Sequence, residues 1–406
     1  MKKVNIKSII DNLIILCLIL FSGLSIGQNR SINFDTASFA ELKIKARRTN
    51  RLIFVDVYTY YCHPCRWMEK NVFTNDTVAD YFNSKFINAK IDAQKGEGIE
   101  IVKLYSVLCY PTYLFLDSAG KLIHRNVGSK PVKSFIQVAE DAQNPDKRFS
   151  RFPDQYEMKK NDAGFLLEYL TAISRTCSKF NPVLNDYFKT QQDNELSKRI
   201  NWYVIRNYTE DIDNRGFQYL LHHTGEFYDK YTLDSVNNVI KDVFLYYGID
   251  IINKKGLKED EFITYLGEIS KINFPFVPEV LFTLNKAYLA LNQDWGKYIT
   301  LMVENADKYI TSINELNDIS WTIYEHSDDP TALLKAKSWM NKVIQDEKDG
   351  QQWFYYDTYA AVLCKLKKKQ EAKAMAIKAI ELAKASGIDK KEYQSTIDLL
   401  KKIEML

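Results

Sequence analysis

Two cysteines separated by two residues, Cys62 and Cys65 in the run Cys-His-Pro-Cys, are the residues of this chain best suited to chemistry. Two thiols at this spacing can close into a disulfide and exchange it with another protein. The apolar run 52–58 is typical of a buried strand, and the residues from Arg66 onward continue as a helix. The pair therefore lies at a helix N-terminus, where free N–H groups and the helix dipole stabilise a thiolate. Pro64 is tolerated in that first turn.

Two other roles for the pair stay open at this stage. Half of a structural zinc site would need two more close ligands. Cys109 is one candidate, but the sequence has no second pair of His or Cys residues at ligand spacing. A disulfide that only staples the chain is the other alternative. We favour redox chemistry and expect no metal site.

The elements that would position the pair alternate short apolar strands with amphipathic helices between residues 31 and 143. The expected strands are 52–58, 86–92, 112–116 and 122–127. The expected helices are 39–49, 65–71, 77–84, 99–105 and 131–142. Gly120 ends the turn of a hairpin between the last two strands, at a position that needs a positive φ. This order implies an α/β fold with a central mixed sheet covered by helices on both faces.

Beyond a linker at 144–147 the chain shows helical periodicity and almost no strands. Small residues near its end, at spacings of 12, 4 and 3, let two antiparallel helices approach closely, as in a tetratricopeptide repeat. These residues are Ala360, Ala372, Ala376 and Ala379. We therefore expect an all-α domain over 146–406, with a tetratricopeptide-like unit at about 315–386. Residues 150–310 carry no readable motif beyond helix, and Asp329 before Pro330 is a helix start signal.

The first 27 residues have the pattern of a secretory signal peptide: a basic start, an apolar run of 14 residues and small residues before a cleavage site after about Gly27. An uncleaved anchor is the alternative, but the run is shorter than the ~20 residues that span a bilayer. Export would place the thiols in the periplasm, an oxidising compartment. Loss of three lysines and Asp11 with this segment lowers the formal net charge from +3 to +1. We therefore expect no nucleic-acid partner.

Residues 31–143 resemble the thioredoxin family, and we expect a thioredoxin-like domain over 28–145. The resemblance rests on the segment Val-Asp-Val-Tyr-Thr-Tyr-Tyr-Cys-His-Pro-Cys at 55–65 and on Tyr110-Pro111-Thr112. Asp56, six residues before the first cysteine, matches the family's buried acid. The second segment matches its cis-proline loop. The helical remainder resembles, less specifically, the extensions found on exported members of the family.

The resemblance implies a role for each matched residue. Cys62 would attack a substrate disulfide as a thiolate, and Cys65 would resolve the mixed disulfide. Asp56 could relay the proton that Cys65 must lose, because an isolated buried carboxyl has a raised pKa. With a cis bond, Pro111 would expose the backbone of Tyr110 for pairing with a substrate strand.

The residues between the cysteines bear on the direction of electron flow. His63 can stabilise the Cys62 thiolate, which would make the site a better oxidant. Pro64 is the residue of the family's reducing members and favours the opposite direction. The direction stays open, with a preference for a reductase.

Other positions depart from the family's pattern. Tyr61 stands where tryptophan is usual and alters the surface that meets partners. Cys109 stands two residues before Pro111, where glycine is common; it is either a regulatory or interchain thiol or a buried small residue. We expect Cys177 and Cys364 to lie in helical cores. Five cysteines remain after the first 27 residues, and an odd number at wide spacings is not a disulfide framework.

The sequence thus predicts an exported protein thiol–disulfide oxidoreductase without a bound cofactor. Its partners would be protein disulfides and a membrane or periplasmic thiol donor, and its helical domain would bind protein. The alternative is a non-catalytic adaptor that uses the thioredoxin fold as a scaffold. Presence of both cysteines, Asp56 and the Pro111 loop favours the enzyme, because a scaffold needs none of them together.

Overall fold

The computed structural model describes four stretches of the chain: residues 30–178, 181–254, 259–347 and 352–406. The predicted signal peptide lies outside these residues. The chain divides into two compact units, one that ends at Thr209 and one that begins at Glu210. Among the described residues, no helix has the length and apolar character that crossing a bilayer requires.

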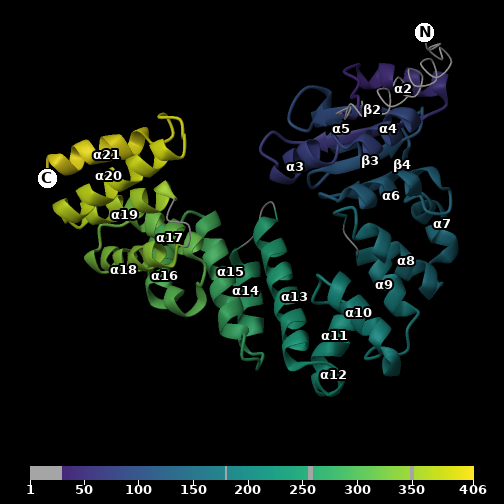
Figure 1. The fold of residues 1–406 in the computed structure, drawn as a ribbon. Helices are drawn as coiled ribbons and strands as arrows, with labels where there is room; N and C mark the ends of the chain where they lie inside the picture. Colours follow the sequence, from purple (N-terminus) through teal and green to yellow (C-terminus); the bar gives the residue numbers. More distant parts are fainter. Residues whose placement is uncertain (1–29, 179–180, 255–258, 348–351) are drawn as a thin grey trace, which may run out of the picture. The chain divides into compact units, whose positions relative to one another are not determined.

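One mixed sheet of four strands forms the framework of the first unit (Figure 1). Its strands are β1 (Leu52–Tyr58), β2 (Phe86–Asp92), β3 (Thr112–Leu116) and β4 (Leu122–Val127). Their order in the sheet is β2-β1-β3-β4; β1 and β2 are parallel, and β3 is antiparallel to both β1 and β4. All four strands occupy the residues expected from the sequence.

Five helices surround the sheet: α2 (Phe39–Thr49), α3 (His63–Asn71), α4 (Asp76–Lys85), α5 (Glu97–Leu104) and α6 (Val132–Gln143). Alternate residues of β1 point to opposite faces, as in any strand. Phe54 joins the apolar cluster formed with α3, α4 and α6, whereas Ile53 and Val55 join the cluster formed with α2 and α5. The predicted thioredoxin fold is therefore confirmed.

The turn between β3 and β4 has the predicted chemistry. Gly120 adopts a φ of 90°, in the region that favours glycine. The Asp117 carboxylate accepts hydrogen bonds from the backbone N–H groups of Ala119 and Lys121, each at 2.8 Å. This turn fixes the register of the hairpin and with it the start of β3.

The first unit continues beyond the sheet with α7 (Arg151–Lys159), α8 (Ala163–Ile173), α9 (Asn181–Lys189) and α10 (Arg199–Tyr208). The segment between α6 and α7 runs along β4. There the Ser150 N–H donates to the Ile123 carbonyl at 3.0 Å, and the Phe149 N–H donates to His124 Nδ1 at 3.1 Å. Among its described residues, the first unit thus contains these four α-helices in addition to the expected thioredoxin-like domain. A domain boundary at residue 145 stays a prediction.

The described part of the second unit is helical, as expected. Its helices are α11 (Arg215–His222), α12 (Thr224–Lys230), α13 (Leu233–Asn253), α14 (Glu259–Ser270), α15 (Val277–Leu291), α16 (Trp295–Tyr309), α17 (Ile313–His326), α18 (Pro330–Asp346), α19 (Trp353–Lys365), α20 (Lys369–Ala385) and α21 (Gln394–Glu404). Asp329 caps α18 through hydrogen bonds from the backbone N–H groups of Thr331 and Ala332, which confirms the predicted start signal.

The pattern of alanines near the C-terminus corresponds to a packed pair of helices. Ala360 of α19 and Ala372, Ala376 and Ala379 of α20 are all fully buried. A short turn joins the two helices, with Lys367 at a φ of 59°. The expected close approach is present; the assignment of 315–386 as a tetratricopeptide-like unit stays a prediction.

Candidate active site

Cys62 and Cys65 lie at the junction of β1 and α3. Cys62 is the N-cap residue of α3, and its Sγ accepts a hydrogen bond from the Cys65 N–H at 3.1 Å. The two side chains form a disulfide with an S–S distance of 2.03 Å, and they are 8% and 5% exposed. Pro64 lies in the first turn of the helix. After reduction, the N–H groups of this turn would stabilise a thiolate at Cys62.

Asp56 is buried on the face of the sheet that α3 covers. It is 2% exposed, and its Oδ1 has no hydrogen-bond partner among the described residues. Burial raises the pKa of this carboxyl to about 7; Lys90 opposes the increase and Glu69 adds to it. A carboxyl with such a pKa can accept and return a proton near neutral pH.

Three neighbours of Asp56 were not identified from the sequence. Lys90 of β2 pairs in register with Asp56 and forms an ion pair with Glu69 of α3 at 2.8 Å. Tyr113 of β3 lies opposite Asp56; burial raises the pKa of its hydroxyl, and so does the Asp56 charge. A lysine in the middle of the strand 86–92 was the available signal for the first of these contacts.

The Tyr110–Pro111 peptide bond is cis and immediately precedes β3. The Pro111 carbonyl accepts a hydrogen bond from the Gly128 N–H at 2.9 Å, which holds the loop against the end of β4. Thr112 pairs with Val57 of β1, so the cis-proline loop and the cysteine pair lie at the same end of adjacent strands.

Aromatic and apolar side chains are exposed near this end of the sheet. Tyr61 is 62% exposed, and its hydroxyl accepts a hydrogen bond from Gln94 Nε2 at 2.9 Å. Burial raises the pKa of Tyr110, and so does the nearby Tyr61. Further exposed side chains are Tyr60, Trp67, Leu104 and Leu108. His63 is also exposed, so the residues flanking the disulfide face solvent while its sulfur atoms are largely covered.

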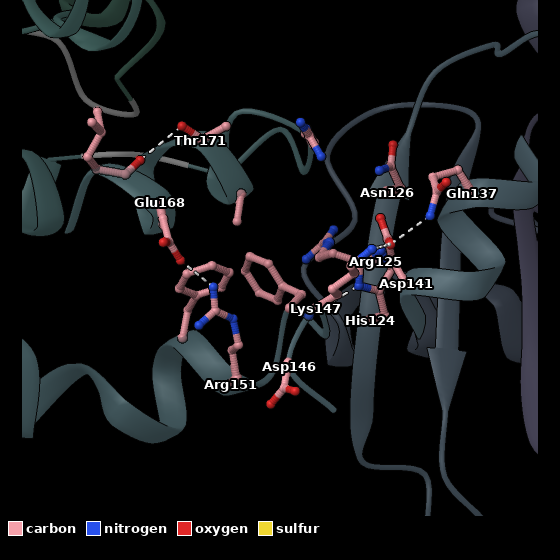
Figure 2. Close-up of a pocket in the computed structure, with 15 residues that line it drawn as sticks. His124, Arg125, Asn126, Gln137, Asp141, Asp146, Lys147, Arg151, Glu168 and Thr171 are labelled. Atoms are coloured by element: carbon pink, nitrogen blue, oxygen red, sulfur yellow. Dashed lines mark hydrogen bonds and ion pairs between the residues drawn. The ribbon is translucent and has the colours of Figure 1, made fainter. Parts of the chain in front are cut away.

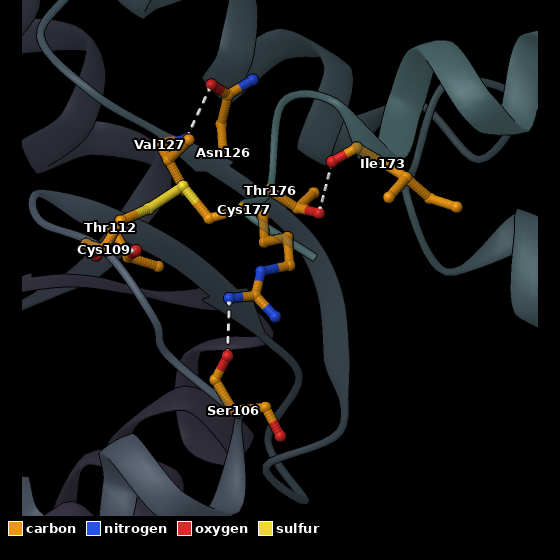
Figure 3. The surroundings of a disulfide bond; sticks show 9 residues. Ser106, Cys109, Thr112, Asn126, Val127, Ile173, Thr176 and Cys177 are labelled. Carbon is orange, nitrogen blue, oxygen red and sulfur yellow. Dashed lines mark hydrogen bonds between the residues drawn. A yellow bond between two sulfur atoms is a disulfide. The ribbon is translucent and has the colours of Figure 1, made fainter. Parts of the chain in front are cut away.

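A second disulfide joins Cys109 to Cys177, with a Cα–Cα distance of 6.4 Å (Figure 3). It corrects two expectations from the sequence. Cys109 is a half-buried disulfide partner, not a free thiol, and Cys177 does not lie in a helical core. Helix α8 ends at Ile173, and Cys177 follows in an exposed segment with a φ of 54°. Cys364, by contrast, is a buried free cysteine in α19, as expected.

A cavity of about 570 Å³ lies between β4 and the helices α7 and α8. Figure 2 shows His124 and Arg125 of β4 on one side of it and Arg151 and Glu168 on the other. Burial lowers the pKa of His124 to about 4, despite the opposing charge of Asp141. This imidazole is therefore neutral at pH 7. None of the predicted site residues lines the cavity.

Comparison with known proteins supports the similarity to thioredoxins. The family model Thioredox_DsbH, described as a protein of unknown function (DUF255), matches residues 31–112. The thiol:disulfide interchange protein DsbD of Yersinia pestis is 30% identical over 113 residues, which are 27% of this chain and 19% of that protein. Thioredoxin-1 of Drosophila melanogaster is 37% identical over 73 residues, 18% of this chain and 64% of that protein.

A solved structure, of a putative disulphide-isomerase from Bacteroides thetaiotaomicron, is 39% identical. The match covers 29% of this chain and 97% of that protein, with a TM-score of 0.28. The chain spans about a fifth of the length of the DsbD proteins that it matches. The residues matched by the family model, 31–112, include the Cys62–Cys65 pair.

Proposed function

Because the N-terminal domain of this chain belongs to the thioredoxin family of disulfide oxidoreductases, we propose that the protein is an exported enzyme that exchanges disulfides with protein substrates. The exchanging residues are Cys62 and Cys65. The observation that carries the proposal is their disulfide across the first turn of α3, on the face of the sheet that buries the Asp56 carboxyl.

In the reducing direction, the Cys62 thiolate attacks one sulfur of a substrate disulfide. The bond between the substrate's sulfur atoms breaks, a mixed disulfide forms, and the second substrate sulfur leaves as a thiolate. Cys65 then transfers its proton towards Asp56 and attacks Cys62. The substrate leaves with two thiols, and the Cys62–Cys65 disulfide is restored. Two electrons pass from enzyme to substrate, and a thiol donor resupplies them.

In this proposal the cis-proline loop binds the substrate. The backbone of Tyr110 next to Pro111 would pair with an extended substrate segment, and the exposed ring of Tyr61 would pack against it. Recognition through main-chain groups tolerates different substrate sequences. His63 and Pro64 set the balance between the oxidised and reduced forms, and the preference for reduction rests on the family's pattern at Pro64 and Asp56.

Export and the helical region complete the proposal. Cleavage after about Gly27 would release the mature protein into the periplasm, where a membrane or periplasmic thiol protein donates electrons. The helices α17–α20 form consecutive pairs, and we expect this tetratricopeptide-like region to bind protein partners. A non-catalytic adaptor would use this region alone.

The test combines activity with trapping. The reduced wild-type protein is expected to reduce a model disulfide such as insulin, and Cys62→Ser to abolish this activity. Cys65→Ser should accumulate a mixed disulfide through Cys62, detected by mass spectrometry. Cys364→Ala is the matched control, since this free cysteine is buried in the second unit. A wild-type protein that neither reduces nor oxidises any disulfide, with a trap that captures nothing, would favour the adaptor.

A further inference from the structure

We propose that Cys109–Cys177 is a second thiol–disulfide exchange site, which accepts two electrons from the reduced Cys62–Cys65 pair and thereby releases the cis-proline loop from the segment after α8. This inference rests on the proposed function of the first pair. The alternative role of this disulfide is that of a permanent structural cross-link. The two roles differ in how accessible the cysteines must be and in whether the bond is exchanged.

The first argument is position. Cys109 lies in the loop that leads to the cis peptide bond, two residues before Pro111. The Cys109 carbonyl accepts a hydrogen bond from Thr112 Oγ1 at 2.6 Å, and Thr112 pairs with Val57 near the end of β1. The chain reaches Cys62 five residues after Val57. Both disulfides therefore lie at one end of the same pair of strands.

The second argument is accessibility. Cys177 is exposed, and Cys109 is half-buried. An exchanging disulfide must admit an attacking thiolate, and exposure of one of its cysteines meets this requirement.

The third argument is the charge around the leaving group. Arg175 lies two residues before Cys177 in the same exposed segment (Figure 3 shows the segment from Ile173 to Cys177). Solvent and cations stabilise a thiolate, and a stabilised thiolate leaves faster. Cys177 is exposed and follows Arg175 in the sequence, whereas Cys109 is half-buried, so Cys177 is the better leaving group.

The exchange balances without an external reagent. The Cys62 thiolate attacks Sγ of Cys109, the Cys109–Cys177 bond breaks, and Cys177 leaves as a thiolate that takes up a proton. Cys65 loses its proton and attacks Cys62, so that the Cys62–Cys109 bond breaks and the Cys109 thiolate is protonated. Two electrons pass from the first pair to the second. This step removes the disulfide that joins the cis-proline loop to the segment after α8.

The decisive experiment uses the full chain with Cys65→Ser, in which Cys62 is a thiol and Cys109–Cys177 is oxidised. After alkylation of free thiols, peptide mapping by mass spectrometry is expected to find a Cys62–Cys109 disulfide and an alkylated Cys177. Cys62→Ser, which lacks the attacking thiol, should keep Cys109–Cys177 intact. An intact Cys109–Cys177 bond in Cys65→Ser would overturn the proposal when the same variant still traps insulin through Cys62. Failure to trap insulin as well would instead count against the proposed function.

A kinetic measurement supplies a second readout. At limiting dithiothreitol, Cys109–Cys177 in the wild-type protein should open at least about tenfold faster than in the double variant Cys62→Ser, Cys65→Ser, because the first pair relays electrons. Cys364→Ala should behave as the wild type. Equal rates in the wild-type and double-variant proteins would identify Cys109–Cys177 as a staple, since a structural role does not depend on the first pair.

Discussion

Asp56 links the proposed chemistry to stability at the scale of single residues. Its folded-state pKa of about 7 lies above the ordinary aspartate value of 3.8, so the folded protein binds this proton more tightly than the unfolded chain. The favourable contribution of the protonated Asp56 to the free energy of unfolding is complete below about pH 4 and is lost as the pH rises through about 7. Above that pH the buried carboxylate lowers the free energy of unfolding by on the order of a few kcal/mol.

We therefore predict that Asp56→Asn, which removes the ionisation, is more stable than the wild type at pH 8 by a larger margin than at pH 5. Urea unfolding of the oxidised proteins at the two pH values measures the difference. Asp80→Asn is the matched control, because that carboxylate is exposed in the same domain. Parallel stability–pH curves for wild type and Asp56→Asn would contradict the assignment.

The same substitution should slow resolution of the mixed disulfide. The wild-type rate is expected to rise with pH through about 7, as Asp56 becomes a carboxylate that can accept the Cys65 proton. Loss of this base costs on the order of 10²-fold in rate. Stopped-flow measurement of mixed-disulfide decay from pH 5 to 9 tests the effect. Retention of the wild-type rate and pH profile by Asp56→Asn would remove Asp56 from the proton path.

At the scale of elements, the sequence was informative wherever a local pattern decides the structure. The four strands follow from short apolar runs between turn residues, and the start of α18 follows from the capping residue Asp329. The Cys109–Cys177 bond could not be found in this way. Its partners are 68 residues apart, and only the path of the chain through α6, α7 and α8 brings them together.

Cys177 shows why an apolar pattern alone was insufficient. A helical position for Cys177 required α8 to continue to residue 177, but this helix ends at Ile173. The local turn there depends on the Thr176 N–H and hydroxyl, both of which donate to the Ile173 carbonyl. The ion pair of Lys90 with Glu69 was missed for a related reason, because it joins a strand to a helix that the sequence does not place side by side.

The packing of α19 against α20 leads to a prediction with a close control. Ala376 of α20 is fully buried, whereas Ala374 two residues earlier is exposed. Ala376→Leu is expected to lower the free energy of unfolding of the helical region by about 1–3 kcal/mol through overpacking. Ala374→Leu should change it by less than about 0.5 kcal/mol. Denaturant unfolding followed by circular dichroism compares them, and equal effects would contradict the packing.

At the scale of the whole molecule, the proposed location depends on processing of the first 27 residues. We predict that the exported protein begins at Gln28, because Ser25 and Gly27 supply the small residues that signal peptidase requires. Mass spectrometry of the N-terminal peptide from the periplasmic fraction measures this. Gly27→Arg should block cleavage and leave the precursor at the membrane. Recovery of the wild-type chain with Met1 intact would favour the uncleaved anchor.

The Cys109–Cys177 bond also closes the main chain into a covalent ring that contains β3, β4 and the helices α6 to α8. A protease that cut the segment 144–150 would therefore not separate the two sides of the cut until the bond was reduced. On a non-reducing gel such a nicked chain would migrate as one species. A fragment that stopped at residue 145 would contain Cys109 without its partner and could dimerise through it, so redox measurements on that fragment would report a thiol that the oxidised full chain does not have.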